Sequence, residues 1–275
     1  FMKRTSLSPE EAASKVRYNF LERIARNWKA DKIALGQTAD DQAETVLLAL
    51  IRGTGIAGLS GIPPTRPLEK SAAMVIRPLI EVFRPEIEKY LRAKKIAARL
   101  DASNLKPAYL RNRIRLGLLP LLETNYNPNI KTALVRLANI LREDNQFILE
   151  ETKKLVPELL VQNNGGLRLD LHTLKTIPLP LQQRLVREAV NTISGNMSPL
   201  STIHWEQIKK LMNSGRTGSY STLPGMVAVR KEYGKVLFMA QNFPKKARVH
   251  LHHELKVLGR NHIPETAFTI DTSLV

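Results

Sequence analysis

Cysteine is missing from this sequence of 275 residues, and aromatic side chains make up only 5% of it. The lack of cysteine excludes a disulfide framework, a zinc–thiolate site and catalysis by a cysteine nucleophile. No apolar run approaches the roughly 18 residues that a membrane-spanning helix needs. We therefore expect a cytoplasmic protein without a membrane partner, whose cores consist mainly of aliphatic side chains.

Acidic residues are also few compared with basic ones. The chain has 42 Lys and Arg against 25 Asp and Glu, which gives a formal net charge of +17. A surplus of this size favours a polyanionic partner, with nucleic acid as the first candidate. A soluble protein with a generic basic surface is the alternative.

The first 125 residues alternate helical and strand-like segments, which is typical of a parallel α/β sheet. Ser8-Pro9 is a helix-start signal, with proline at the first helical position and acids in the following turn. The segments after this helix are a strand at 32–36, a polar turn at 37–41, a helix from Gln42 to about Ile51, a glycine-rich loop at 52–61, a strand at 74–79 and a helix from 84 to about 94.

The second part of the chain has a different pattern. It predicts a long amphipathic helix at 131–155, helices at 181–193 and 204–212, and short strands at 219–223, 226–231 and 235–239. We therefore expect an α/β unit to about residue 125 and a mostly helical unit beyond it.

Three carboxylates stand where a parallel sheet binds ligands. Asp40, Asp41 and Glu44 follow a strand within about one helical turn, and ligands of such sheets bind outside the carboxyl ends of strands. Thr38 and Asp41 also fit a capping box, which would need no function. Crowded carboxylates repel one another unless a cation neutralises them, so an ammonium group or Mg²⁺ would be well held. Capping and function both remain open.

Arginine is concentrated in a second segment that has no acid from Ala102 to Leu122. If this segment is helical, Arg111 and Arg115 share one face and Arg113 lies on another. Guanidinium groups suit phosphates, and a solvated basic face is the alternative. His250, His252 and His253 are near neighbours but have Glu254 as their only close acid, so we assign no protein-only metal site.

Several motifs, in one order along the chain, resemble the bacterial tRNA(Ile)-lysidine synthases. They are Ala39-Asp40-Asp41-Gln42-Ala43-Glu44-Thr45, Ile51-Arg52-Gly53-Thr54-Gly55, Ile76-Arg77-Pro78-Leu79, Tyr109-Leu110-Arg111-Asn112-Arg113-Ile114-Arg115 and Leu223-Pro224-Gly225-Met226. The resemblance implies an α/β fold: the C-terminal part of a Rossmann-like, parallel-sheet ATP-pyrophosphatase domain, followed by a mostly helical second domain. The division it implies is a partial catalytic domain at 1–125, a substrate-binding domain at 126–241, and a linker with the start of a truncated C-terminal region at 242–275.

The resemblance also implies an activity and its partners. The family adenylates the wobble cytidine of tRNA(Ile) with a CAU anticodon, and free lysine then displaces AMP to give lysidine. ATP with Mg²⁺ is a substrate, no prosthetic group is expected, and a homodimer is a candidate assembly. A non-catalytic tRNA-binding remnant and another tRNA-modifying ATP-pyrophosphatase are the alternatives.

Roles carry over to the matching residues of this chain. The resemblance implies catalytic roles, in positioning lysine and cytidine, for Asp40, Asp41 and Glu44. Contacts with nucleotide or tRNA are implied for Arg52, Arg77, Arg111, Arg113 and Arg115, and supporting roles for Gln42, Thr45 and Asn112.

One family motif does not occur in these 275 residues: the ATP loop Ser-Gly-Gly-x-Asp-Ser. In the family it follows the first strand, which would place it upstream of Phe1. Gln37 also stands where the family commonly has histidine. We therefore expect the chain to be a fragment of a longer enzyme.

This expectation has a direct biochemical test. Mixed with ATP, lysine and cognate tRNA, these 275 residues should release no pyrophosphate, because no loop is present to bind the triphosphate. A coupled pyrophosphate assay measures it, and release above a tRNA-free control would contradict the fragment hypothesis.

Overall fold

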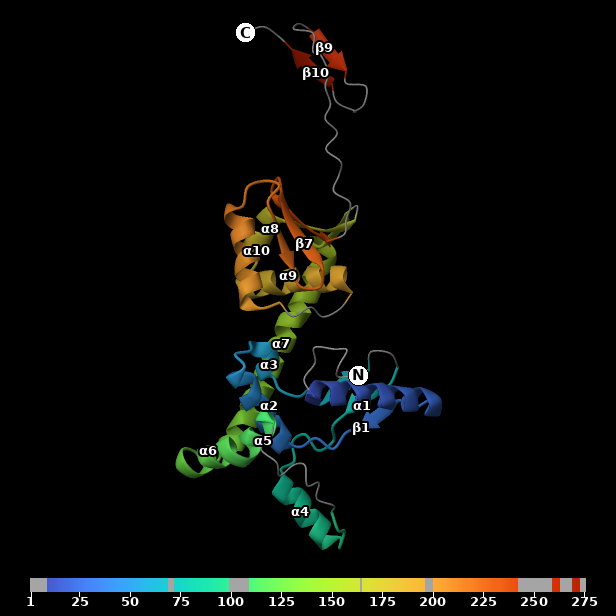
Figure 1. Ribbon diagram of the computed structural model, residues 1–275, viewed down its shortest axis with the longest axis vertical. Coiled ribbons are helices and arrows are strands. Elements are labelled where there is room, and N and C mark those ends of the chain that lie inside the picture. Colours follow the sequence, from blue (N-terminus) through green and yellow to red (C-terminus); the bar gives the residue numbers. More distant parts are fainter. Residues whose placement is uncertain are drawn as a thin grey trace. The chain divides into compact units, whose positions relative to one another are not determined.

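The computed structural model describes residues 9–68, 72–98, 109–163, 165–195, 200–241, 259–262 and 269–272. The chain divides into two compact units, Phe1–Glu151 and Thr152–Val275. The elements of both are labelled in Figure 1. The predicted domain boundaries near residues 125 and 241 stay predictions, because compact units and family domains need not coincide.

A small mixed sheet lies in the first unit. Strand β1 (Lys32–Ala34) pairs in parallel with β3 (Met74–Ile76), which pairs on its other side with the antiparallel strand β2 (Thr65–Pro67). The parallel pair agrees with the expected α/β class, whereas β2 was not predicted. Helix α1 (Pro9–Trp28) contributes Ala25 to the core beside this sheet, where Ala25 packs with Val75.

Helix α2 (Ala39–Ile51) follows β1 through a short connection. The predicted start at Gln42 is wrong by three residues, because Thr38 caps the helix and brings Asp40 and Asp41 into its first turn. The glycine-rich segment contains one short helix, α3 (Ile56–Leu59), and was expected to be loop throughout. Helix α4 (Arg84–Ala93) agrees with the prediction.

The remaining helices of this unit pack against α2. They are α5 (Leu110–Arg113), a π-helical turn at Ile114–Leu118, α6 (Leu119–Asn125) and α7 (Ile130–Leu159), the last of which continues into the second unit. Their shared core includes Val46, Ile114 and Leu134. The long helix was predicted, and the π-helical turn was not.

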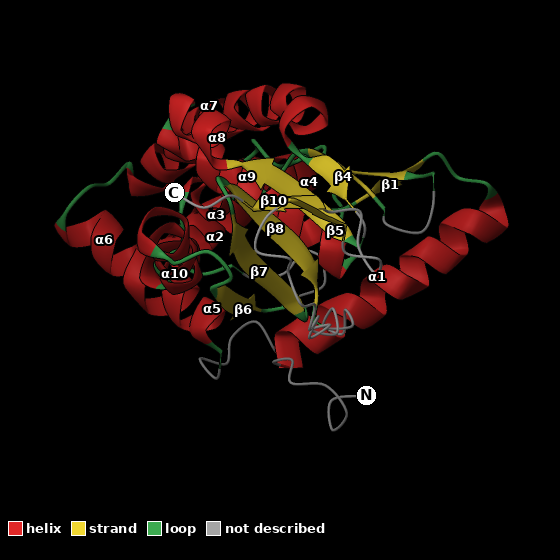
Figure 2. Cartoon of the chain, turned by 90° about the horizontal axis from the view of Figure 1, so that it is seen from above, coloured by secondary structure: helices red, strands yellow, loops and turns green. Residues whose placement is uncertain are grey.

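The second unit combines helices with a five-stranded antiparallel sheet of order β4-β5-β8-β7-β6. Its strands are β4 (Val161–Asn163), β5 (Gly166–Asp170), β6 (Tyr220–Leu223), β7 (Val227–Glu232) and β8 (Lys235–Ala240), and Figure 2 shows the central ones side by side. Its helices are α8 (Leu171–Thr176), α9 (Leu179–Ser194) and α10 (Thr202–Ser214). The two longer helices and the last three strands were predicted, and β4, β5 and α8 are additions.

Beyond this sheet the structure describes one further pair of strands, β9 (Gly259–His262) and β10 (Thr269–Thr272), which pair antiparallel. The cluster His250, His252 and His253 lies outside the described residues. None of the helices that the structure describes is long and apolar enough to cross a membrane.

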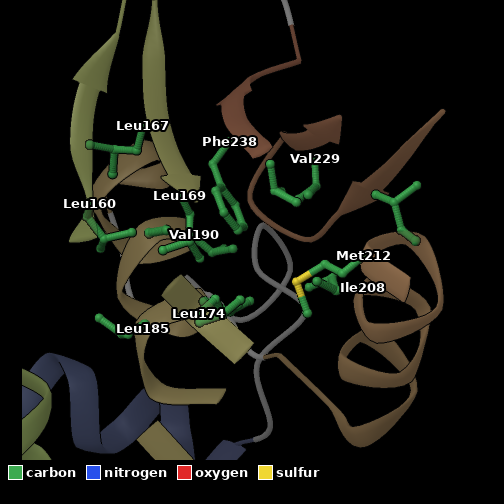
Figure 3. Packing of buried hydrophobic residues seen from close by; sticks show 14 of the residues in the cluster. Leu160, Leu167, Leu169, Leu174, Leu185, Val190, Ile208, Met212, Val229 and Phe238 are labelled. Atoms are coloured by element: carbon green, nitrogen blue, oxygen red, sulfur yellow. The ribbon is translucent and has the colours of Figure 1, made fainter. Parts of the chain in front are cut away.

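One face of the five-stranded sheet and its three helices enclose the main apolar core. Figure 3 shows Phe238 among the leucine and valine side chains of this cluster, with Met212 and Ile208 contributed by α10. Val236 and Phe238 of β8 belong to this core and are fully buried, whereas Leu237 between them is buried outside this cluster. The period-two alternation of strands therefore orients this sheet.

Truncation of Phe238 to alanine should destabilise this unit by about 3–5 kcal/mol, because removal of the ring leaves a cavity that the packed neighbours cannot fill. Tyr233→Ala is the matched control, because Tyr233 is 87% exposed. Urea denaturation followed by circular dichroism measures both, and equal midpoints for the two variants would be incompatible with this core.

Candidate active site

The first turn of α2 is built by a reciprocal cap. The Thr38 backbone N–H donates to Asp41 Oδ2 at 2.9 Å, the Thr38 hydroxyl donates to the same oxygen at 3.1 Å, and the Asp41 N–H donates to Thr38 Oγ1 at 3.5 Å. The capping box that the sequence suggested is therefore present. It uses one carboxylate oxygen of Asp41 and leaves Oδ1 for other partners.

Two arginines supply the cations that the crowded carboxylates require. Arg111 Nε donates to Glu44 Oε2 at 3.0 Å, and Arg111 Nη2 donates to Asp41 Oδ1 at 3.3 Å. Arg115 donates to both oxygens of Glu44, from Nε at 2.5 Å and from Nη2 at 2.9 Å, and to Asp41 Oδ1 at 3.3 Å. We call Asp41, Glu44, Arg111 and Arg115 the charged cluster.

The π-helical turn forms part of this arrangement. Arg111 belongs to α5 and Arg115 to the π-helical turn, and both side chains reach α2 although 67 to 74 residues separate the partners. The wider π turn adds a residue to the helical path, and such turns are frequent at functional sites. The expectation that Arg111 and Arg115 share a face is confirmed, and Arg113 is exposed.

The members of the charged cluster differ in their exposure to solvent. The Glu44 side chain is 2% exposed, whereas Arg115, Asp41 and Arg111 are 19%, 20% and 32% exposed. Hydrogen bonding to Glu44 raises the pKa of Arg115, with the negative charges of Glu44, Asp41 and Asp40 acting in the same direction against the effect of burial. The cluster is thus held from inside by Glu44 and is accessible through Asp41 and Arg111.

Asp40 faces other partners than its neighbour. Its Oδ2 accepts the backbone N–H of Arg84, the first residue of α4, at 2.8 Å, and its Oδ1 lies 3.5 Å from Lys131 Nζ. Lys131 also pairs with Glu123 at 3.2 Å. Asp40 therefore caps α4 and binds α7, roles that the sequence did not reveal.

Gln42 and Thr45 form hydrogen bonds within and next to this turn. The Gln42 amide donates to Ile62 O at 3.2 Å and accepts from Ile62 N at 2.6 Å, and the Thr45 hydroxyl donates to the Asp41 carbonyl at 2.8 Å. Gly61, beside Ile62, has φ of +64°, and a Cβ there would lie 2.5 Å from Gln42 Oε1. Glycine is thus required where the loop meets Gln42.

Arg142 of α7 holds the same loop from a second direction. Its Nη2 donates to the carbonyls of Ser60 and Ile62 at 3.0 and 3.2 Å, and within the described part of the chain its buried Nε has no hydrogen-bond partner. Burial lowers the pKa of Arg142, an effect that Glu81 and Glu143 partly offset. The loop end is therefore clamped between α2 and α7.

Arg77 follows β3 and is only 5% exposed. It donates to the Gln37 side chain, to Pro63 O at 2.6 Å and to the Tyr18 hydroxyl at 3.3 Å. Burial tends to raise the pKa of Tyr18, but Arg66 and Arg77 together lower it. This placement suits a role inside the protein, and contact between Arg77 and tRNA stays a prediction.

Two expected residues lie elsewhere on this unit. Arg52 is exposed at the C-terminal end of α2, at the opposite end from the charged cluster, and Asn112 is half-buried in α5. Among the residues that the structure describes, no group of three or more His, Asp or Glu side chains could hold a metal ion.

Comparison with known proteins identifies two domains. A model of the PP-loop domain matches residues 2–122, and a model of the TilS substrate binding domain matches residues 169–237. The first match covers the charged cluster, and the second covers most of the five-stranded sheet.

Several curated relatives carry the name tRNA(Ile)-lysidine synthase. The chain is 34% identical to that of Clostridioides difficile, over 84% of this chain and 49% of the relative, and 34% identical to that of Solibacter usitatus, over 97% and 58%. The protein of Geobacter sulfurreducens is 36% identical, over 84% and 48%. The chain spans about half the length of the curated relatives it matches.

A solved structure matches more weakly. The U34-tRNA thiolase NcsA from Methanococcus maripaludis matches 50% of this chain and 45% of its own at 22% identity and a TM-score of 0.38.

Loss of the buried carboxylate has a predictable cost. Glu44→Gln should destabilise the first unit by about 2 kcal/mol, less than for a fully buried pair because both arginines are partly solvated. Glu123→Gln is the control, since its side chain is 33% exposed. Thermal unfolding measures both, and an unchanged midpoint for Glu44→Gln would mean that the charged cluster does not stabilise the fold.

Proposed function

We propose that the chain belongs to the family of tRNA(Ile)-lysidine synthases and takes part in the ATP-dependent joining of free lysine to the wobble cytidine of tRNA(Ile) with a CAU anticodon. The pairing of a PP-loop domain with a TilS substrate binding domain in one chain supports this activity. A tRNA substrate would place the reaction in the cytoplasm.

The observation that carries the proposal is the charged cluster itself. It presents two carboxylates and two guanidinium groups within hydrogen-bonding distance of one another, with Asp41 and Arg111 partly open to solvent. The α-ammonium and α-carboxylate of a free amino acid form the matching pair of charges. Asp41 would take the ammonium, and Arg111, released from Asp41, would take the carboxylate.

Binding the α end of lysine leaves its side-chain amine free to react. An ammonium held by two carboxylates is stabilised in its charged form, and a protonated amine has no lone pair with which to attack. The amine that reacts must therefore lie away from Asp41 and Glu44. Orientation by this cluster would direct it toward the cytidine, which is how fixed geometry accelerates a step between two substrates.

The chemistry proceeds in two steps. The cytidine O2 attacks the α-phosphorus of ATP and pyrophosphate leaves. The lysine amine nitrogen then bonds to C2 as the bond from C2 to the AMP oxygen breaks, and the nitrogen loses a proton. Mg²⁺ carried by ATP would neutralise phosphate charge in the first step. Asp41 and Glu44 are already paired with arginines, so the triphosphate would have to supply most of the magnesium ligands.

The alternatives fit less well. A non-catalytic tRNA-binding remnant would account for the buried Glu44 as a fold-stabilising ion pair, but it would give no role to the solvent-accessible carboxylate of Asp41 beside Arg111. A thiolating relative usually relies on cysteine, and this sequence has none. A homodimer stays a prediction.

Asp41→Asn in the full-length protein should reduce lysine incorporation at least a hundredfold, because the neutral amide cannot pair with an ammonium. Asp40→Asn should lose far less, since an amide oxygen still accepts the Arg84 N–H. Transfer of radiolabelled lysine to tRNA(Ile) measures both. Asp144→Asn, exposed on α7, is the control.

Full activity of Asp41→Asn would contradict the proposed role of the charged cluster. A deficit that excess lysine repairs would indicate that the cluster binds lysine, whereas a deficit independent of lysine concentration would assign it to the adenylation step.

A further inference from the structure

Helix α4 has an unusual relation to the rest of its unit. None of its residues is buried, and Figure 1 shows it extending from the region of α2 and α5. Only its N-terminal end is held by described hydrogen bonds: the Arg84 N–H donates to Asp40 at 2.8 Å, and just before the helix the Ala39 N–H donates to Val82 O at 3.0 Å. A helix that buries so little surface contributes little to the core of its unit.

The free end of α4 is strongly basic. Lys89, Arg92, Lys94 and Lys95 are exposed, and no acid occurs from Lys89 to Ala98. None of these four side chains forms an ion pair with another described residue. One or two cations would suffice to complement the helix dipole, so four unpaired ones exceed what helix stability requires.

An aromatic ring accompanies these charges. Tyr90 is 60% exposed, and Lys94 Nζ lies 5.9 Å from the centre of its ring. Tyr90 and Lys94 are four residues apart and share a helix face. A flat aromatic face beside lysine and arginine is the combination by which proteins hold single-stranded RNA, with stacking on the bases and pairing with the phosphates.

The hydrogen bond from the Arg84 N–H to Asp40 places the start of α4 next to the charged cluster. Asp40, which caps α4, is the neighbour of Asp41 in the first turn of α2. With a rise of about 1.5 Å per residue, Lys89 to Lys95 lie roughly 8–16 Å along the axis from Arg84. At about 3.4 Å per stacked nucleotide, this corresponds to roughly two to five nucleotides.

We propose that α4 is an RNA-binding arm that holds the nucleotides flanking the reacting base through Lys89, Arg92, Lys94, Lys95 and a stacking contact on Tyr90. This assignment rests on the proposed function, because it takes the charged cluster as the position of the reacting cytidine. Asp40 then has a positioning role: it fixes the direction of the arm relative to Asp41.

The test compares two variants that lose equal charge. In one, Lys89, Arg92, Lys94 and Lys95 are each replaced by glutamine, which keeps helix propensity. In the matched control, the exposed residues Lys15, Arg23, Arg26 and Lys29 in and next to α1 are replaced by glutamine. Fluorescence anisotropy measures binding of labelled tRNA(Ile) and of its anticodon stem-loop to the full-length protein over a series of salt concentrations.

The α4 variant should bind the stem-loop at least tenfold more weakly. The slope of log affinity against log salt should fall by about 3–4, since each of the four lost phosphate contacts contributes about 0.7–0.9. The control should stay within about twofold of the unmodified protein. Tyr90→Leu should weaken binding about tenfold, and Tyr90→Phe, which keeps the ring, should restore it.

Three other outcomes would show whether the RNA-binding arm alone fails or the proposed function fails as well. Equal losses in both glutamine variants would show that net charge alone matters and would overturn the arm. Unchanged binding by the α4 variant, with salt-dependent binding by the unmodified protein, would overturn the arm and leave the proposed function standing. If the unmodified protein bound neither RNA, both proposals would fail.

Discussion

The buried carboxylate of Glu44 is the constraint on which the first unit depends. At 2% exposure it has lost its hydration, and a carboxylate in that position is tolerated only with compensating cations. Arg111 and Arg115 provide them from a segment 67 to 71 residues away. The ion pairs therefore join α2 to α5 and the π-helical turn, and the same contacts assemble the candidate site.

One carboxylate can cap a helix and still present an oxygen to other partners, as Asp41 illustrates. One oxygen accepts from Thr38 in the helix cap, and the other faces both arginines. The sequence left open whether Asp41 caps the helix or belongs to a site. The geometry makes the two interpretations compatible, because each uses a different oxygen of Asp41. The cap fixes the rotation of the side chain, and this fixed rotation is what a binding site needs in order to be preorganised.

The features that could be predicted from the sequence are those set by residues close together in the chain. The Thr38–Asp41 cap, the proline at the start of α1 and the apolar strand segments that form β1 and β3 all depend on neighbouring residues. The partners of the carboxylates could not be predicted from the residues, because Lys131 and the Arg84 N–H reach Asp40 only through tertiary packing. The burial of Arg77 was missed for the same reason, since the glutamine, carbonyl and hydroxyl that receive its hydrogen bonds belong to three separate segments. The crowding of the three carboxylates indicated that a cation was needed, but the arginine-rich segment was assigned to phosphates or to a solvated face, so its pairing with Asp41 and Glu44 was not predicted.

Three consecutive residues of α2 show why this helix organises the unit. Successive side chains turn by about 100° around a helix axis, so neighbours in sequence face different surroundings. Asp40 turns to α4 and Lys131, Asp41 to the cap and the arginines, and Gln42 to the backbone of Ile62. An amide is required at Gln42 because it must donate and accept at once, which a carboxylate cannot do. A rotation of α2 would break all three sets of contacts together, so the orientation of the charged cluster is set by the whole turn.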